Sequence, residues 1–98
     1  MKTIIYGSGK DIERQYAKCT TFAMMNGYDT AETTDTIPKT IERLAKRDID
    51  IVLVANKSIV ADNELELEIV SSTFARYGAM LIIVEWGIKF PLMLQIIN

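Results

Sequence analysis

Three short apolar runs alternate with longer stretches in which apolar and polar residues mix. The runs cover residues 3–6, 49–55 and 79–84, and each predicts a buried β-strand, although Asp50 interrupts the second run. From Ile51 to Ala55 the chain is apolar throughout, so we expect a central parallel strand that is buried on both faces.

The stretch at residues 11–26 has helical periodicity. Its apolar residues recur at spacings of three and four, namely Ile12, Tyr16, Cys19 and Ala23, with Met24 beside them. Asp11 and Glu13 suit the positive end of a helix dipole, and Gly27 provides a C-terminal stop. We therefore predict a helix here, with Cys19 packed in the core rather than reactive.

A polar stretch and a second helix follow. Residues 28–36 are rich in threonine and aspartate and predict a loop, with a short strand at residues 28–30 as an alternative. Thr36 is a predicted N-cap, and Pro38 fits the first turn because its missing N–H costs nothing there. We expect this helix to run to about Arg47. Its predicted inward side chains are Ile41, Leu44 and Ala45.

The stretch at residues 62–77 fits two periods. Residues 64–69 alternate glutamate with leucine or isoleucine, which is typical of a strand, but the pattern continues beyond ordinary strand length before Gly78. Length therefore favours a helix, with its glutamates solvated rather than grouped as metal ligands. The predicted apolar face consists of Leu65, Ile69, Val70, Thr73, Phe74 and Tyr77.

Strands and helices thus alternate along a single domain that spans residues 1–98. Such alternation predicts parallel strands joined by right-handed crossovers. The predicted fold class is therefore α/β, a three-layer arrangement with a mainly parallel four-stranded sheet and helices on both faces.

The last residues, 88–98, are mostly apolar. Pro91 suits the start of a short helix over about residues 90–98, and such a helix is hard to bury completely in a small domain. An exposed apolar helix usually marks a partner surface, so we expect a homodimer or a protein partner here. The interface candidates are Leu92, Met93, Ile96 and Ile97.

Composition narrows the chemistry. The chain has 11 Lys and Arg against 13 Asp and Glu, a net charge of -2, which argues against a strongly basic nucleic-acid surface. It has no histidine and one cysteine, so an internal disulfide and histidine acid–base chemistry are excluded, and a zinc site would lack its usual ligands. We expect no metal and no cofactor. With neither a signal peptide nor a spanning segment in the pattern, we expect a cytoplasmic protein without membrane contact.

Several motifs stand in a recognisable order. They are the strand ending at Tyr6, the helix with Gly27 behind it, the strand at residues 49–55, the helix-glycine-strand turn at residues 76–81, and the apolar start of a terminal helix at residues 91–97. In this order and spacing, the chain resembles the N-terminal catalytic domain of the serine recombinases, the resolvase/invertase family. The resemblance covers nearly the whole chain and implies DNA as a partner.

The departures from that family fall on its chemistry. Family enzymes attack a DNA phosphodiester with a serine and stabilise the charge with arginines. Counting from Tyr6, Ser8 stands where the family has an arginine and Lys10 where it has the nucleophilic serine. The segment at residues 56–63 keeps Lys57 but neither family arginine, and the loop before Pro38 lacks its arginine too. The resemblance therefore implies a scaffold that no longer exchanges DNA strands and acts by self-association or partner binding in DNA recombination or a mobile element.

Two alternatives rest on the glycine-rich turn at residues 7–10. Backbone N–H groups at a helix start favour anions, and the candidate anion-binding residues are Ser8, Gly9, Lys10, Lys57 and Ser58. One alternative is a small phosphate- or nucleotide-binding enzyme that uses this loop. The other is an active recombinase in which Ser8 is the nucleophile. Against both stands an ordinary turn with a solvated loop, in which Lys10 pairs with Asp11 or Asp62.

Overall fold

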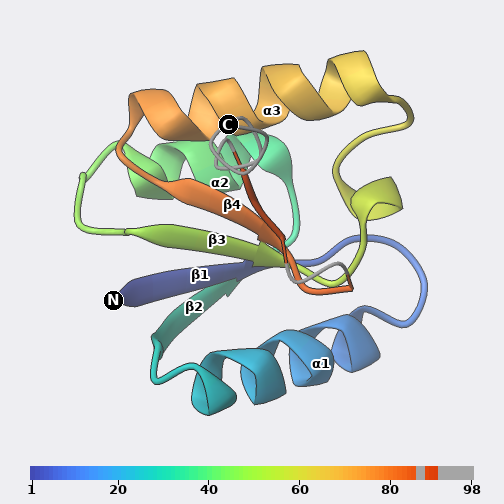
Figure 1. Cartoon of the computed structure of the whole chain (residues 1–98), viewed down its shortest axis with the longest axis vertical. Coiled ribbons are helices and arrows are strands. Elements are labelled where there is room, and N and C mark those ends of the chain that lie inside the picture. Colours follow the sequence, from blue (N-terminus) through green and yellow to red (C-terminus); the bar gives the residue numbers. More distant parts are fainter. Residues whose placement is uncertain (86–87, 91–98) are drawn as a thin grey trace.

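One sheet with the strand order β2-β1-β3-β4-β5 forms the middle layer of the molecule (Figure 1). The computed structural model describes residues 1–85 and 88–90. The strands are β1 (Lys2–Tyr6), β2 (Asp29–Thr34), β3 (Ile51–Val54), β4 (Met80–Ile83) and β5 (Ile88–Phe90). The helices are α1 (Ile12–Met25), α2 (Ile37–Leu44) and α3 (Glu64–Arg76), and a short 3-10 turn, η1, spans Lys57–Ile59.

The first four strands are parallel, and helices cover both faces of the sheet. α1 lies on one face, whereas α2 and α3 lie on the other (Figure 1). This confirms the predicted α/β class with a four-stranded parallel sheet. The fifth strand, β5, is antiparallel to β4 and was not predicted. It includes Phe90, which the sequence pattern had placed at the start of a terminal helix; the rest of that helix, with Leu92, Met93, Ile96 and Ile97, lies outside the described residues.

The central strand β3 separates two apolar clusters. Because side chains alternate along a strand, Ile51 and Leu53 pack toward α1, while Val52 and Val54 pack toward α2 and α3. The first cluster also contains Ile5, Cys19, Ala23, Ala55 and Ile82. The second also contains Ile4, Tyr6, Leu44, Leu67, Phe74, Leu81 and Ile83. Burial of β3 on both faces is as predicted.

Strand β2 corrects the prediction of a loop at residues 28–36. It runs from Asp29 to Thr34, well beyond the short strand at residues 28–30 that was the alternative. β2 lies at the edge of the sheet and pairs with β1, so its backbone groups are bonded along one side, and the side chains of Asp29, Glu32 and Thr33 are exposed. The Thr3 hydroxyl adds a bond by donating to the Asp29 carbonyl at 2.8 Å.

Helix α2 begins as predicted and ends earlier. The Thr36 hydroxyl accepts a hydrogen bond from the Lys39 N–H at 3.1 Å, which confirms the N-cap. The helix stops at Leu44 rather than near Arg47, because Arg47 takes a left-handed conformation with φ 59. Leu44 is fully buried, but Ala45 is exposed, contrary to the prediction that it faces inward.

Helix α3 buries only part of the face predicted for it: Phe74 is buried, and Val70 and Tyr77 pack partly buried against the core. Leu67, Ser71 and Phe74 are buried, whereas Leu65 and Ile69 are 67% and 57% exposed. Because each residue turns a helix by about 100°, Leu65 and Leu67 point to nearly opposite sides. Met24 on α1 is likewise 74% exposed, so it does not belong to the inward row with Cys19. Among the described helices, none combines the length and apolarity needed to cross a bilayer.

Candidate functional site

The loop between β1 and α1 lies at the carboxyl edge of the parallel strands, where ligands usually bind in this class of fold. The Gly7 N–H donates to the Thr34 carbonyl at 3.0 Å and ties the loop to β2. A Cβ atom at Gly7 would come within 2.7 Å of the Tyr16 ring, so only glycine fits here without a shift. Burial, with Asp35 nearby, raises the pKa of Tyr16, and its hydroxyl donates to the Thr34 carbonyl at 3.2 Å.

Gln15 of α1 holds the shape of this loop. Its side-chain oxygen accepts from the Ser8 N–H at 2.9 Å, and its amide nitrogen donates to the carbonyls of Ser8 at 2.8 Å and Lys10 at 3.0 Å. Gly9 and Asp11 both take left-handed conformations, with φ 76 and 61, so the chain turns sharply before the helix. The Ser8 N–H is therefore already bonded within the protein and does not point at a ligand.

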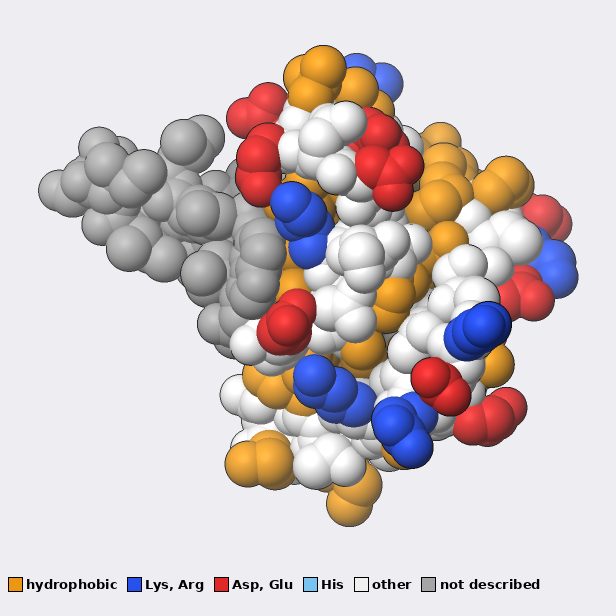
Figure 2. Space-filling view, turned by 90° about the vertical axis from the view of Figure 1, so that its right-hand side faces the viewer, with side chains coloured by type: hydrophobic (Ala, Val, Ile, Leu, Met, Phe, Trp, Pro, Cys, Tyr) orange, Lys and Arg blue, Asp and Glu red, His pale blue; other side chains and the backbone are white. Residues whose placement is uncertain are grey.

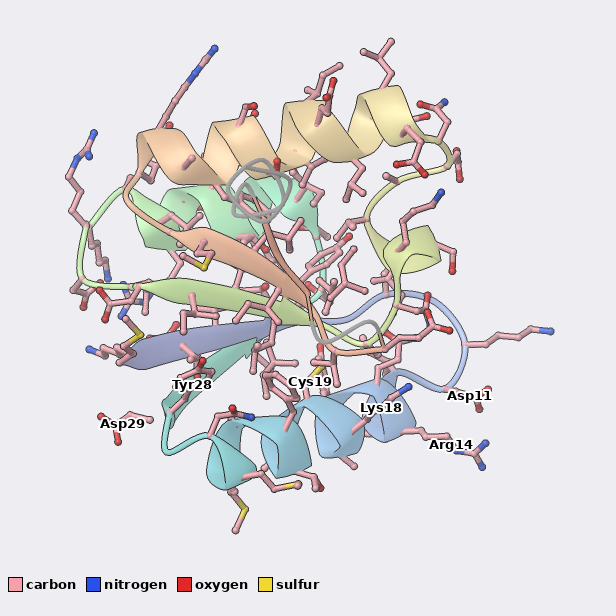
Figure 3. The ribbon with its side chains drawn as sticks, in the orientation of Figure 1. Asp11, Arg14, Lys18, Cys19, Tyr28 and Asp29 are labelled. Carbon is pink, nitrogen blue, oxygen red and sulfur yellow. The ribbon has the colours of Figure 1, made fainter. Side chains whose placement is uncertain are left out.

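A shallow pocket of about 250 Å³ lies beside this loop, between the start of α1 and the end of β3. It is lined by Lys10, Asp11, Arg14, Gln15, Lys18, Ala55 and Asn56. Figure 2 shows basic side chains gathered over the start of α1, with acidic ones among them. In Figure 3, Arg14 extends outward near the N-terminal end of α1, where Asp11 also lies. Cys19 lies on the side of the helix that faces the sheet. We call the shallow pocket the basic pocket. It offers cationic and amide groups to an anion, whereas the Asp11 carboxylate would repel one.

The predicted anion-binding residues do not come together in this pocket. Lys10 lines it, and Ser8 and Gly9 lie in the adjoining loop. Lys57 and Ser58 belong to η1 at the same edge of the sheet but are engaged elsewhere. The Lys57 ammonium pairs with Glu64 at 3.0 Å, and the Ser58 hydroxyl donates to Asn56 Oδ1 at 2.6 Å. The predicted pairing of Lys10 with Asp11 or Asp62 is not among the ion pairs of the described residues.

Four pocket residues had no predicted role in the site: Arg14, Gln15, Lys18 and Asn56. A signal for the cations was present, because Lys10, Arg14 and Lys18 recur every four residues and therefore share one side of the helix and its entry turn. Gln15 had no such signal, since its role depends on how the loop folds back over the helix.

The chain's other arginines lie away from this edge of the sheet. The Arg43 guanidinium bonds Glu32 Oε1 at 2.7 Å and Asp48 Oδ2 at 3.1 Å, near the starts of β1 and β3. This contact holds the pKa of Asp48 well below its ordinary value. Arg47 donates to the Arg76 carbonyl at 3.2 Å and stacks over the Tyr77 ring at 5.7 Å from its centroid. Arg14 is thus the arginine at the carboxyl edge.

The thiol of Cys19 and the carboxylates of α3 are the remaining groups with possible chemical roles. Burial raises the pKa of the Cys19 thiol to about 12, with Lys18 opposing the shift, so at neutral pH the thiol is protonated inside the core. Within residues 1–85 and 88–90, no three side chains among His, Cys, Asp and Glu converge as metal ligands, and Glu64, Glu66 and Glu68 form no such group.

The comparisons with known proteins give the fold a name. No protein-family model and no curated protein matches the sequence. Among solved structures, a resolvase family site-specific recombinase from Streptococcus pneumoniae superposes with a TM-score of 0.84 at 21% identity, over 98% of this chain and 82% of that one. The C-terminal catalytic domain of ISC1926 TnpA, an IS607-like serine recombinase, gives 0.76 at 20% identity, over 87% of this chain and 70% of that one. This chain therefore has the fold of the serine recombinase catalytic domain.

Proposed function

We propose that this chain is a degenerate homologue of the resolvase-type recombinase domain. It does not exchange DNA strands, and it acts as a self-associating or partner-binding module in DNA recombination or in a mobile element. The fold similarity supports the relationship. The placement of the arginines carries the claim that strand exchange is lost.

Strand cleavage through a serine needs a free hydroxyl and fixed positive charge around the phosphate. Ser8 does not line the basic pocket, and the chain has no histidine to activate it. Arg14 is the arginine at this edge, and Lys57 is neutralised by Glu64. A phosphoryl-transfer transition state spreads charge over several oxygens, and one arginine offers little to stabilise it.

The cleavage claim is tested by incubating the protein with supercoiled DNA and trapping covalent adducts under denaturing conditions. We expect no adduct. An adduct that disappears in Ser8→Ala would overturn the proposal and restore an active recombinase.

Self-association is tested by sedimentation. We expect the intact chain to form a dimer, and the run of apolar residues at 91–97 makes that segment the first target. The double variant Leu92→Glu, Ile96→Glu should weaken the dimer. A native chain that stays monomeric at every concentration would exclude this part of the proposal.

The basic pocket favours a second candidate, a small phosphate- or nucleotide-binding protein. Lys10, Arg14 and Lys18 present positive charge on one side of α1, and Asn56 adds an amide from the end of β3. A volume of about 250 Å³ leaves room for a phosphate group with part of a nucleoside.

Chemical-shift titration with pyrophosphate and with AMP tests this candidate. Binding should move the amides of Lys10, Arg14 and Asn56 and should be lost in an Arg14→Ala, Lys18→Ala variant. Arg47→Ala, at the other edge of the sheet, is the matched control. An absence of shifts at about 5 mM ligand would exclude a specific site, because a site with a Kd of about 1 mM would be mostly occupied at that concentration.

A further inference from the structure

Helix α3 carries a second row of side chains that the described part of the chain leaves largely exposed. Leu65, Glu68, Ile69, Ser72, Thr73 and Arg76 line a shallow groove of about 350 Å³ along the helix. We call this row the outer α3 face. It lies on the side of α3 away from Leu67 and Phe74, which pack on the sheet.

The apolar part of the outer α3 face is exposed. Leu65 and Ile69 are one helical turn apart, and both are more than half exposed. Figure 2 shows hydrophobic side chains at the end of the molecule where α3 begins, with acidic side chains beside them. Covering such a pair removes apolar surface from water and would stabilise a docked partner.

Charge along the outer α3 face is ordered from one end to the other. Glu68 lies in the first half of the helix and Arg76 is its last residue. Among the ion pairs of the described residues, neither side chain takes part. Eight residues of α-helix separate them by about 12 Å along the axis. Ser72 lies midway, and its small side chain lets another helix approach closely at that point.

We infer that the outer α3 face is the contact between two copies of this chain, packed antiparallel about a two-fold axis near Ser72. This inference rests on the self-association proposed above and adds a second contact surface to the one tested at residues 91–97. In a two-fold interface, each residue that contacts a second residue is contacted by it in return. Glu68 of each copy then lies opposite Arg76 of the other, so the charges match twice.

The same charge order disfavours the parallel arrangement. Two parallel helices would bring Glu68 opposite Glu68 and Arg76 opposite Arg76, and like charges across an interface are repulsive. The antiparallel pair also brings Leu65 of each copy over the aliphatic stem of Arg76 in the other, a surface that long basic side chains commonly offer. Charge complementarity therefore favours a second copy of this chain, in the antiparallel orientation, as the partner of the outer α3 face.

The contact is small. A pair of short helices buries less than the roughly 1,600 Å² of a standard protein interface, so we expect weak, reversible association rather than a permanent dimer. Sedimentation equilibrium should therefore be run up to about 1 mM protein.

Charge reversal tests the inference without disturbing the core. Glu68→Arg places two repulsive Arg–Arg contacts in the dimer, and Arg76→Glu places two Glu–Glu contacts there. Each variant alone should associate at least about tenfold more weakly than the native chain. An equimolar mixture of the two should regain the native association constant, because both contacts in the mixed dimer are again Arg–Glu. Glu42→Arg, an exposed charge reversal on α2, is the matched control and should behave as the native chain.

The outcomes separate this inference from the proposed function. Thermal melts first verify that each variant folds. If the native chain dimerises and the α3 variants dimerise equally well, the outer α3 face is not the contact, although self-association stands. If both single variants are weakened and the mixture stays monomeric, the antiparallel pairing is wrong. If the native chain never associates, the inference and the self-association proposal both fall.

Discussion

The side chain of Gln15 bonds both backbone polar groups of Ser8. Its Oε1 accepts from the Ser8 N–H at 2.9 Å, and its Nε2 donates to the Ser8 carbonyl at 2.8 Å. A glutamine in the first turns of α1 thus satisfies these backbone groups from within the protein. The β1–α1 loop is consequently a closed structural element, and the basic pocket lies beside it.

Removing this clamp should loosen the loop. In Gln15→Ala, the Ser8 N–H and the carbonyls of Ser8 and Lys10 lose their partner, and we expect a loss of about 1–2 kcal/mol in the free energy of unfolding. Amide exchange should quicken at Ser8 while β3 stays protected. Thr21→Ala, which removes an exposed hydroxyl from the same helix, is the control. Unchanged exchange at Ser8 would show that the clamp does not hold the loop.

Two glycines in this loop should respond differently to substitution. Gly7→Ala brings a methyl group against the Tyr16 ring, so we expect a destabilisation of about 1–3 kcal/mol in urea unfolding. Gly9 has open space around it and a φ of 76, a conformation that asparagine tolerates. Gly9→Asn should therefore cost less than Gly7→Ala. The reverse order would contradict the close approach of Tyr16.

The Cys19 thiol should be inert in the folded protein. It is fully buried, and its pKa is raised to about 12, so both access and thiolate are lacking at neutral pH. We expect labelling by a disulfide reagent at about pH 8 to be at least 100-fold slower than in denaturant. Ser72→Cys in a Cys19→Ala background supplies an exposed thiol for comparison. Equal labelling rates for the two thiols would be inconsistent with this burial.

The same burial predicts how stability responds to alkaline pH. The pKa of Cys19 is higher in the folded state than the ordinary value of 9.0, so the folded state keeps the thiol proton longer. Its contribution to stability is complete below about pH 9 and is lost as the pH rises toward 12. Cys19→Ala should therefore lose less stability over that window than the native chain, as measured by urea unfolding at each pH.

The contact of Arg43 with Asp48 predicts an effect in acid. Because the pKa of Asp48 is depressed from 3.8 in the folded state, its contribution is present above that value and is lost as the pH falls below it. Arg43→Met should lower the melting temperature at pH 7, and the difference from native should shrink near pH 3. Arg14→Met is the same substitution away from Asp48. A difference that is constant with pH would exclude this electrostatic origin.

How far the sequence predicts the fold is clearest on α3. The alternation of glutamate with leucine and isoleucine places apolar residues on two sides of the helix, and the sequence does not say which side meets the sheet. Phe74 was expected inside and is buried, but Leu65 and Ile69 were also expected inside and are exposed, while Leu67 is buried in their place. The helix itself was correctly predicted from its length.

The edges of the sheet and the pocket were harder to predict. The residues of β2 are mostly polar and therefore predicted a loop. The strand forms because its backbone pairs with β1, and as an edge strand it tolerates polar side chains. β5 is short and antiparallel, so it lacked the long apolar run that marks β3. The pocket joins α1 to the end of β3, and only the folded chain brings Arg14 close to Asn56.

The most direct test of the central claim is a cleavage assay on supercoiled plasmid with the native chain and Ser8→Ala. Reactions are stopped with detergent, and protein-linked DNA is recovered and sized, with an active serine recombinase as positive control. Our account predicts neither nicking nor adduct for either protein. A covalent adduct formed by the native chain and absent in Ser8→Ala would contradict it.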